Sequence, residues 1–308
     1  MFTMDLDSQA IKYTRLEATS LEGNFLKAIQ EEIGETEESR RECLRILSET
    51  LNELEDVECC MDEGFLLKFL RVAKFDCEKA FDRIKGYYKM QEMLTNLLKN
   101  TSIPISTIRN MKYTFALPYR AKDNSIVTVA RMGVIDYSKI SFEGRSFLDI
   151  ISTVNILKNP ITQMCGITII FDFADFKYSS LLAVNPKIAF DYMYYMQKAF
   201  PLRIKAFHVI NASSVFWAFY KLFCLVMSKK LRRRIYVYPN NDNWKSLHSC
   251  IPPEILPEDL GGHLPKSRLI DLLDDVEKLE KETLEQFQFG YKITKHVRMS
   301  MKIIEPDK

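Results

Sequence analysis

The sequence predicts an α/β protein in which a helical N-terminal subdomain precedes an α/β domain with a mixed or parallel sheet. The first hundred residues keep a helical hydrophobic period, which predicts several packed helices. From about residue 125, segments rich in β-branched residues alternate with helical segments, an order typical of layered α/β folds. One of these segments, residues 166–172, is almost continuously apolar, as expected for a strand buried on both faces.

The N-terminal subdomain is expected over residues 1–100. Residues 37–56 and 62–75 each carry an apolar helical face, and Asp76 is a suitable N-cap for a third helix. The chain is long enough to add one large domain to this subdomain, or to form two ordinary ones.

The α/β domain is expected over residues 101–265. Residues 101–125 contain two prolines and lose the helical period. The β-branched segments predict strands at 125–132, 166–172, 202–210 and 234–238. The intervening periodic segments predict helices at 145–158, 179–199 and 213–227.

The C-terminal part, residues 266–308, is expected to hold a charged helix and a tail. Residues 267–287 combine many charges with an interrupted apolar stripe, which predicts a helix lying on the surface. Residues 290–308 are expected to be loosely ordered.

The composition is that of a globular protein. Hydrophobic residues make up 47% of the chain, charged residues 27%, and the net charge is only +2, so a basic surface has to be a local patch. We therefore expect no nucleic-acid partner. The aromatic content of 12% suits a large core, and also a cavity that holds an apolar guest.

The cysteines and the N-terminal residues predict a cytoplasmic protein. The seven cysteines are an odd number without a CxxC pair, which favours reduced thiols over a disulfide framework. With four histidines, none near two cysteines at ligand spacing, no zinc site and no cofactor are expected. The first residues lack a signal-peptide core, Phe2 excludes N-terminal myristoylation, and no run of about 18 apolar residues predicts a membrane span.

No motif makes a positive case for an enzyme. The chain has no phosphate-binding loop of the GxxxxGK type, no GxGxxG, no GxSxG elbow and no HExxH helix. His208 lies in a predicted core strand, where a structural histidine is the more frequent finding. Asp172 ends a predicted strand, where it could line a site or bind the backbone of the following turn.

Residues 213–227 form a helix that is apolar nearly all round. One interpretation is a helix buried in the core. The other is a lid, with one face on an apolar guest and the other on a membrane or a protein.

Residues 228–234 place five cations directly after this helix. Cations at a helix C-terminus complement its dipole, but one or two would be enough. Arg203 and Lys205 are two apart in a predicted strand and share one face. An apolar helix beside such a cluster is typical of a membrane-surface contact, and nuclear localisation is a weaker alternative.

Three segments, in order, resemble motifs of the CRAL-TRIO family. Residues 66–76 (LLKFLRVAKFD) are similar to its N-terminal helical signature, residues 200–211 (FPLRIKAFHVIN) to a core strand, and residues 255–262 (ILPEDLGG) to its closing motif. The resemblance covers about residues 37–265 and is closest to the branch that contains the α-tocopherol transfer protein, the retinaldehyde-binding protein and the clavesins. It implies a helical domain packed on a lipid-binding domain, with a pocket between the sheet and a mobile lid helix.

The resemblance also implies a set of site residues. The pocket wall is expected to include Ile151, Ile167, Ile169, Phe171, Tyr192, Tyr195, Met196 and Phe207. The lid is expected to contribute Val215, Phe216, Phe219, Leu222 and Phe223. The basic patch that binds phosphoinositide headgroups in the tocopherol carrier is expected at Arg203, Lys205, Lys230 and Arg234.

Two departures from the family pattern stand out. The usual run of three cations reads Arg71-Val-Ala-Lys74 here, which loses one cation, and Asp175 replaces a glycine after the acid of the core strand. Asp tolerates left-handed backbone geometry better than most residues, so the turn is expected to survive.

The sequence thus predicts a non-enzymatic, cytoplasmic carrier, monomeric and transiently associated with membranes, whose hydrophobic ligand exchanges when phosphoinositides open the lid. Tyrosine hydroxyls in the pocket could meet a polar group of that ligand, a tocopherol-like or retinoid-like lipid or a phospholipid. The alternative is a lipid-responsive adaptor that recruits a protein partner through residues 267–287.

Overall fold

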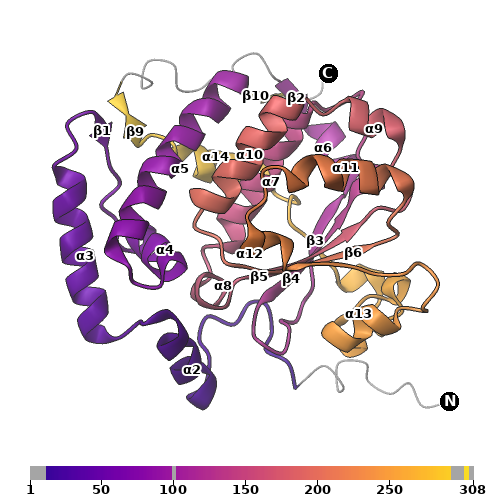
Figure 1. Cartoon of the computed structure of the whole chain (residues 1–308), viewed down its shortest axis with the longest axis horizontal. Coiled ribbons are helices and arrows are strands. Elements are labelled where there is room, and N and C mark those ends of the chain that lie inside the picture. Colours follow the sequence, from indigo (N-terminus) through magenta and orange to yellow (C-terminus); the bar gives the residue numbers. More distant parts are fainter. Residues whose placement is uncertain (1–11, 99–101, 293–301, 305–308) are drawn as a thin grey trace.

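The computed structural model describes residues 12–98, 102–292 and 302–304. A helical N-terminal part packs against an α/β part that is built on one central sheet (Figure 1). This confirms the predicted fold class. Among the described residues, no helix is both long and apolar enough to cross a membrane.

The described N-terminal part holds four helices, and side chains cap the starts of three of them. They are α2 (Gly23–Ile33), α3 (Glu37–Asn52), α4 (Glu63–Ala73) and α5 (Cys77–Leu98). Thr36 and Ser39 form a capping box at the start of α3, and Asp76 accepts a hydrogen bond from the backbone N–H of Lys79 in the first turn of α5. The predicted cap at Asp76 is therefore confirmed.

The central sheet is mixed and has the order β7-β6-β5-β4-β3-β8. Strands β4 to β7 run parallel, and β3 and β8 each pair antiparallel with their neighbour. The strands are β3 (Thr114–Ala116), β4 (Ile126–Arg131), β5 (Ile167–Asp172), β6 (Ile204–Ile210), β7 (Ile235–Val237) and β8 (Ile270–Asp271). Residues 101–125, which lose the helical period, also hold β2 (Ser102–Pro104) and the short helix α6 (Ile105–Met111).

Helices cover one face of the sheet, and α13 with the following loops packs on the other (Figure 1). The helices of this part are α7 (Phe142–Ile156), α8 (Pro160–Cys165), α9 (Tyr178–Leu182), α10 (Pro186–Lys198), α11 (Ser214–Cys224), α12 (Lys229–Arg232) and α13 (Lys245–Cys250). Ile170 of β5 and Val127 of β4 belong to the cluster on the α13 side, so the sheet is buried on both faces.

The single helix predicted over 179–199 is two helices, α9 and α10. Proline has no backbone N–H and restricts the residue before it, so Pro186 begins a helix instead of continuing one. The side chain of Asn185 accepts hydrogen bonds from the N–H groups of Lys187 and Ile188, which caps the new helix.

Asp175 adopts left-handed geometry, with φ of 58°. The turn survives the loss of glycine, as expected. The residue that has to be glycine here is Gly133, because its backbone packs directly against this turn. A Cβ atom at Gly133 would lie 1.8 Å from the carbonyl oxygen of Ala174.

The buried side chain of Arg71 links the N-terminal helices to the α/β part. Arg71 of α4 binds Glu35 through Nη2 at 2.7 Å and Nε at 2.9 Å, and Nη1 donates to Gln163 of α8. All three side chains are buried. The first cation of the Arg71–Lys74 run is therefore part of the interface between the two parts.

The C-terminal residues are more integrated than predicted. The helix expected over 267–287 begins only at Val276, as α14 (Val276–Gln286), because residues 270–271 add the edge strand β8 to the sheet. Val276 and Leu279 are buried in the main core, and α14 packs on α7. The apolar stripe that suggested a docking surface is thus used within the molecule.

The tail expected to be loosely ordered contains two short strands. β9 (Gly290–Tyr291) pairs with β1 (Val57–Glu58), and β10 (Lys302–Ile304) pairs with β2. The other residues of this prediction, 293–301 and 305–308, lie outside the described residues.

Candidate functional site

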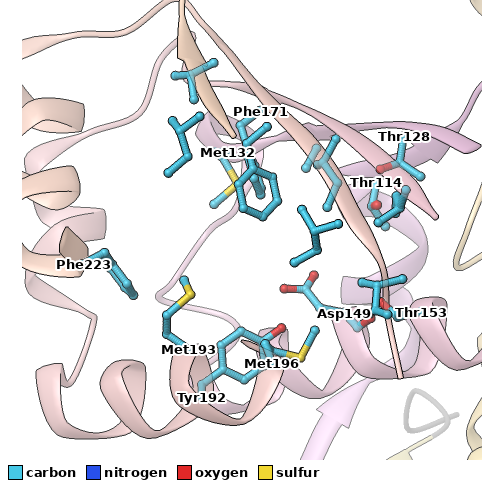
Figure 2. Close-up of a pocket in the computed structure, with 18 of the residues that line it drawn as sticks. Thr114, Thr128, Met132, Asp149, Thr153, Phe171, Tyr192, Met193, Met196 and Phe223 are labelled. Carbon is cyan, nitrogen blue, oxygen red and sulfur yellow. Dashed lines mark hydrogen bonds between the residues drawn. The ribbon is translucent and has the colours of Figure 1, made fainter. Parts of the chain in front are cut away.

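A cavity of about 210 Å³ lies between the sheet and the helices α7, α10 and α11. One water molecule needs only about 10–15 Å³ in such a measure, so the cavity has room for a far larger guest. Figure 2 shows side chains from several of these elements pointing into it. Most of the lining is apolar.

The sheet supplies an apolar floor because side chains alternate along a strand. Ile167, Ile169 and Phe171 of β5 face the cavity, and Phe207 and Val209 of β6 continue the same surface. These strand positions follow directly from the period of two.

Helix α11 closes the cavity with one aromatic face. Phe216, Phe219 and Phe223 line the cavity from successive turns. Away from the cavity Trp217 is 44% exposed and Leu225, just after the helix, is 76% exposed. The helix is therefore not buried all round: it separates the cavity from solvent with apolar side chains on both faces.

One end of the cavity is polar. Arg145 and Asp149 lie one turn apart on α7, both line the cavity, and Nη1 of Arg145 donates to Oδ2 of Asp149. The hydroxyl of Tyr113 donates to the other carboxylate oxygen at 2.7 Å. Burial raises the pKa of Asp149 above its ordinary value, an effect that Arg145 and the hydroxyls of Tyr113 and Tyr192 oppose.

Six of the eight predicted pocket residues line the cavity, and two do not. Those that do are Ile167, Ile169, Phe171, Tyr192, Met196 and Phe207. Ile151 lies on the side of α7 opposite to Arg145 and Asp149 and is fully buried in the main core. Tyr195 lies away from the face of α10 that carries Tyr192 and Met196.

Three of the five predicted lid residues, Phe216, Phe219 and Phe223, line the cavity. Val215 and Leu222 do not, because both lie roughly a quarter turn or more from that face of α11. Tyr220, which was not predicted, occupies a position on the lining face.

The four predicted patch residues come together at the edge of the sheet with two further cations. Lys230 lies close enough to Arg234, Lys74, Arg83 and Arg203 that partial desolvation of its ammonium group and these charges lower its pKa. Lys205 shares its ion-pair partner, Glu32, with Arg203 and Lys74. We call these six residues, Lys74, Arg83, Arg203, Lys205, Lys230 and Arg234, the basic patch.

The cations of the basic patch differ in how many partners they already have within the protein. Arg203 donates to the backbone carbonyl of Met164, and Arg234 donates to that of Ile204, so both also hold the sheet edge. Lys230 is exposed. Partial burial acts to raise the pKa of Glu32, but Arg203 and Lys205 hold it below its ordinary value.

The cations of residues 228–234 do not sit at the end of α11. Helix α11 ends at Cys224, and Ser228 caps a separate short helix, α12. Lys230 and Arg234 belong to the basic patch, whereas Lys229, Arg232 and Arg233 are exposed to solvent.

The two candidate catalytic residues have structural partners. Nδ1 of His208 lies 2.6 Å from the hydroxyl of Tyr238, and burial lowers the pKa of the imidazole to about 4. Asp172 accepts hydrogen bonds from the backbone N–H of Ala174 at 2.9 Å and from Asn211 at 2.8 Å. All seven cysteines are free, and the described residues contain no cluster suited to a metal ion.

Sequence reasoning missed the polar end of the cavity and the acid within the basic patch. Arg145 and Asp149 are spaced i, i+4, and after Glu143 they are the only charged residues of α7, which was the available signal. Glu32 carried no such signal, because it is one of several acids on an exposed helix and lies far from Arg203 in the sequence.

Comparisons with known proteins agree with this architecture. Residues 110–262 match the family described as CRAL/TRIO domain. Clavesin-1 of Rattus norvegicus is 28% identical over 207 residues, which cover 66% of this chain and 58% of that relative. Alpha-tocopherol transfer protein-like of Homo sapiens is 24% identical over 245 residues, which cover 79% of this chain and 71% of that relative.

The chain thus spans 58% of the length of its clavesin-1 relative. The solved structure titled "Crystal structure of Sfh5" superposes with a TM-score of 0.39 at 10% identity, covering 86% of this chain and 99% of that chain. That similarity is too low to support a shared functional detail.

Proposed function

Because residues 110–262 make this chain a member of the CRAL/TRIO family, we propose that the protein binds one small hydrophobic lipid beneath α11 and transfers it between membranes. The observation that carries this proposal is the cavity of about 210 Å³ with its aromatic and aliphatic lining. Pockets of this kind bury most of a ligand's apolar surface. The relative named alpha-tocopherol transfer protein-like supports the transfer part of the proposal.

Exchange requires α11 to move. A ligand that buries about 500 Å² of apolar area gains on the order of 12 kcal/mol, part of which is offset by the loss of motional freedom. Such a ligand leaves slowly from a closed cavity. A membrane that binds the open state more tightly than the closed state would shift the protein toward opening.

We further propose that the basic patch binds phosphoinositide headgroups and brings the cytoplasmic protein, as a monomer, to the membrane surface. Six cations gather where α12 meets the sheet edge, and each cation near an anionic bilayer contributes roughly 1 kcal/mol. The exposed apolar residues Trp217 and Leu225 lie on the neighbouring α11 and just after it. A basic cluster beside an apolar helix face is suited to a membrane interface.

The test of lipid binding is native mass spectrometry with lipid extraction on the protein purified from its own tissue. One bound lipid per chain is expected, and transfer from loaded to empty vesicles should follow. Protein without lipid that also takes up none from mixed vesicles would contradict the carrier and favour an adaptor.

The patch is tested with Lys205→Gln/Lys230→Gln, which leaves the carbonyl contacts of Arg203 and Arg234 in place. We expect weaker binding to vesicles that contain phosphatidylinositol bisphosphate, and slower transfer to them. Lys139→Gln/Lys245→Gln removes the same charge outside the basic patch and is the matched control. Equal effects of the two double variants would show that only net charge matters.

A further inference from the structure

A second cavity lies at the carboxyl ends of β6 and β7, on the side of the sheet where Figure 1 shows α13. Ile210 ends β6, Leu247 lies on α13, and both line this cavity and belong to the core on the α13 side. Its volume is about 110 Å³, whereas one water molecule needs only about 10–15 Å³. Open α/β sheets typically bind ligands at the carboxyl ends of their parallel strands. We call this space the loop cavity.

Much of the lining of the loop cavity is polar and in contact with solvent. The polar side chains that line it include those of Asn211, Asn240, Asp242 and Asn243. Asn240 and Asn243 are exposed, and Asn211 and Asp242 are half-buried. A ligand that enters from solvent can therefore reach these groups, and it has to be far more polar than the guest of the cavity beneath α11.

The amides in this lining have hydrogen-bonding capacity left. Nδ2 of Asn211 donates to Oδ1 of Asp172 at 2.8 Å, and Nδ2 of Asn240 donates to the backbone carbonyl of Ala212 at 3.4 Å. An amide side chain carries two N–H donors and an oxygen with two lone pairs. Each of these amides can thus still donate to a ligand and accept from it, and the bond to Asp172 holds Asn211 in place.

The charge of the lining restricts the class of ligand. Asp242 lines the loop cavity, and no lysine or arginine does so in the part of the chain that the structure describes. Hydrogen bonds from Ser246 lower the pKa of Asp242, so its carboxylate is ionised at neutral pH. An anionic group would meet this charge with no cation to balance it. A hydroxyl group donates and accepts as the amides do, and carries no charge.

Trp244 gives the loop cavity one apolar, aromatic side. Its backbone is left-handed, with φ of 67°, which is uncommon for a bulky residue. The indole packs on Gly261, where a Cβ atom would lie 2.4 Å from Cδ1 of Trp244. Strained residues that the surrounding structure holds in this way are frequent at ligand sites. An indole beside amides suits a sugar-like ring, because such a ring combines apolar C–H groups with polar hydroxyls.

We infer that the loop cavity is a second binding site, which takes a neutral, hydroxyl-rich ring such as a monosaccharide or a cyclitol. This inference goes beyond the proposed lipid binding and does not depend on it, because the two cavities lie on opposite faces of the sheet.

The test is saturation-transfer NMR of the full chain with glucose, myo-inositol and glucose 6-phosphate as probes. We expect saturation transfer to at least one of the two neutral probes, and weaker binding of glucose 6-phosphate than of glucose. Asn243→Gly removes one amide and keeps the left-handed backbone accessible, since Asn243 has φ of 50°. It should weaken binding about fivefold, as for the loss of a hydrogen bond.

Two further variants locate the binding. Asn241→Gly changes a neighbouring exposed asparagine that does not line the loop cavity, and should leave binding unchanged. Trp217→Phe leaves Trp244 as the only tryptophan, and its fluorescence should then change as the neutral probe is added.

The inference would be overturned if neither neutral probe received saturation, or if glucose 6-phosphate bound more tightly than glucose. Equal losses in Asn243→Gly and Asn241→Gly, or fluorescence of Trp244 that does not respond, would likewise place any binding elsewhere. Lipid transfer between vesicles tests the proposed function separately, and its failure would leave the sugar titration unaffected.

Discussion

Arg203, at the entry to β6, forms an ion pair with Glu32 of α2, 171 residues earlier in the chain. Lys205 and Lys74 approach the same carboxylate at 3.7 and 3.6 Å. Glu32 therefore occupies three cations of the basic patch, and any anionic headgroup that binds there has to compete with it.

Glu32→Gln should consequently strengthen binding to vesicles that contain phosphatidylinositol bisphosphate. Removing one competing charge near a surface contributes roughly 1 kcal/mol, or about fivefold in affinity. The measurement is vesicle cosedimentation over a range of lipid concentrations. Glu31→Gln changes the same charge one residue away, where no ion pair is seen among the described residues, and should have a smaller effect. Equal gains in the two variants would refute the competition.

Arg71 is expected to be important for stability. In its ion pair with Glu35, the side chain of Arg71 is 10% exposed and that of Glu35 is 6% exposed. Arg71→Met leaves a buried, unpaired carboxylate, which typically costs about 3–5 kcal/mol. Denaturant unfolding should show this loss. Arg45→Met is the control, since Arg45 pairs with Glu42 and Glu49 at 54% exposure, where such pairs contribute about 0–1 kcal/mol. Similar losses in both variants would contradict the assigned role.

Trp217 is expected to report membrane contact. It is 44% exposed on the outer face of α11, and the chain has only one other tryptophan, Trp244. On addition of anionic vesicles the fluorescence emission should shift to shorter wavelength, because indole moves from water into the interface. Trp217→Phe keeps an aromatic side chain and should lose the shift. A shift that survives in this variant would exclude α11 as the contacting helix.

His208 should make stability depend on pH. Burial lowers its pKa from 6.5 to about 4 in the folded protein. Between these values the unfolded chain binds the proton and the folded chain does not, so stability is full above about pH 6.5 and falls as the pH drops toward 4, by about 3 kcal/mol in total.

His208→Gln, which can still form a hydrogen bond with Tyr238, should flatten this slope in urea unfolding measured at pH 7.5, 6 and 5. His263→Gln alters an exposed histidine and should retain the slope. An unchanged slope in the His208 variant would assign the pH dependence to other groups.

Much of the fold was readable from local patterns. The strands β4, β5 and β6 lie within the predicted segments, because β-branched runs and the period of two are properties of neighbouring residues. The family resemblance implied Ile167, Ile169 and Phe171 for the pocket wall, and the period of two puts all three on one face of β5, which lines the cavity. The predicted mixed or parallel sheet is confirmed.

The sequence-based predictions were wrong in two situations. One was where a side chain on a helix had to point toward the cavity, and the other was where a short element interrupts a longer one. Ile151 and Tyr195 lie on helices that do line the cavity, but their side chains point to other neighbours, which a helical period alone does not identify. The break between α9 and α10 had a local signal in Asn185-Pro186 that the apolar period concealed.

By itself, the sequence determined the fold class, the apolar face of β5 and four of the six cationic residues of the patch, because these depend on residue type and on local spacing. Only the tertiary structure decided that Glu32 lies among those cations and that Arg145 and Asp149 line the cavity as an ion pair. Both depend on which distant segments pack together, and the energies of buried and paired charges follow from that packing rather than from the order of residues along the chain.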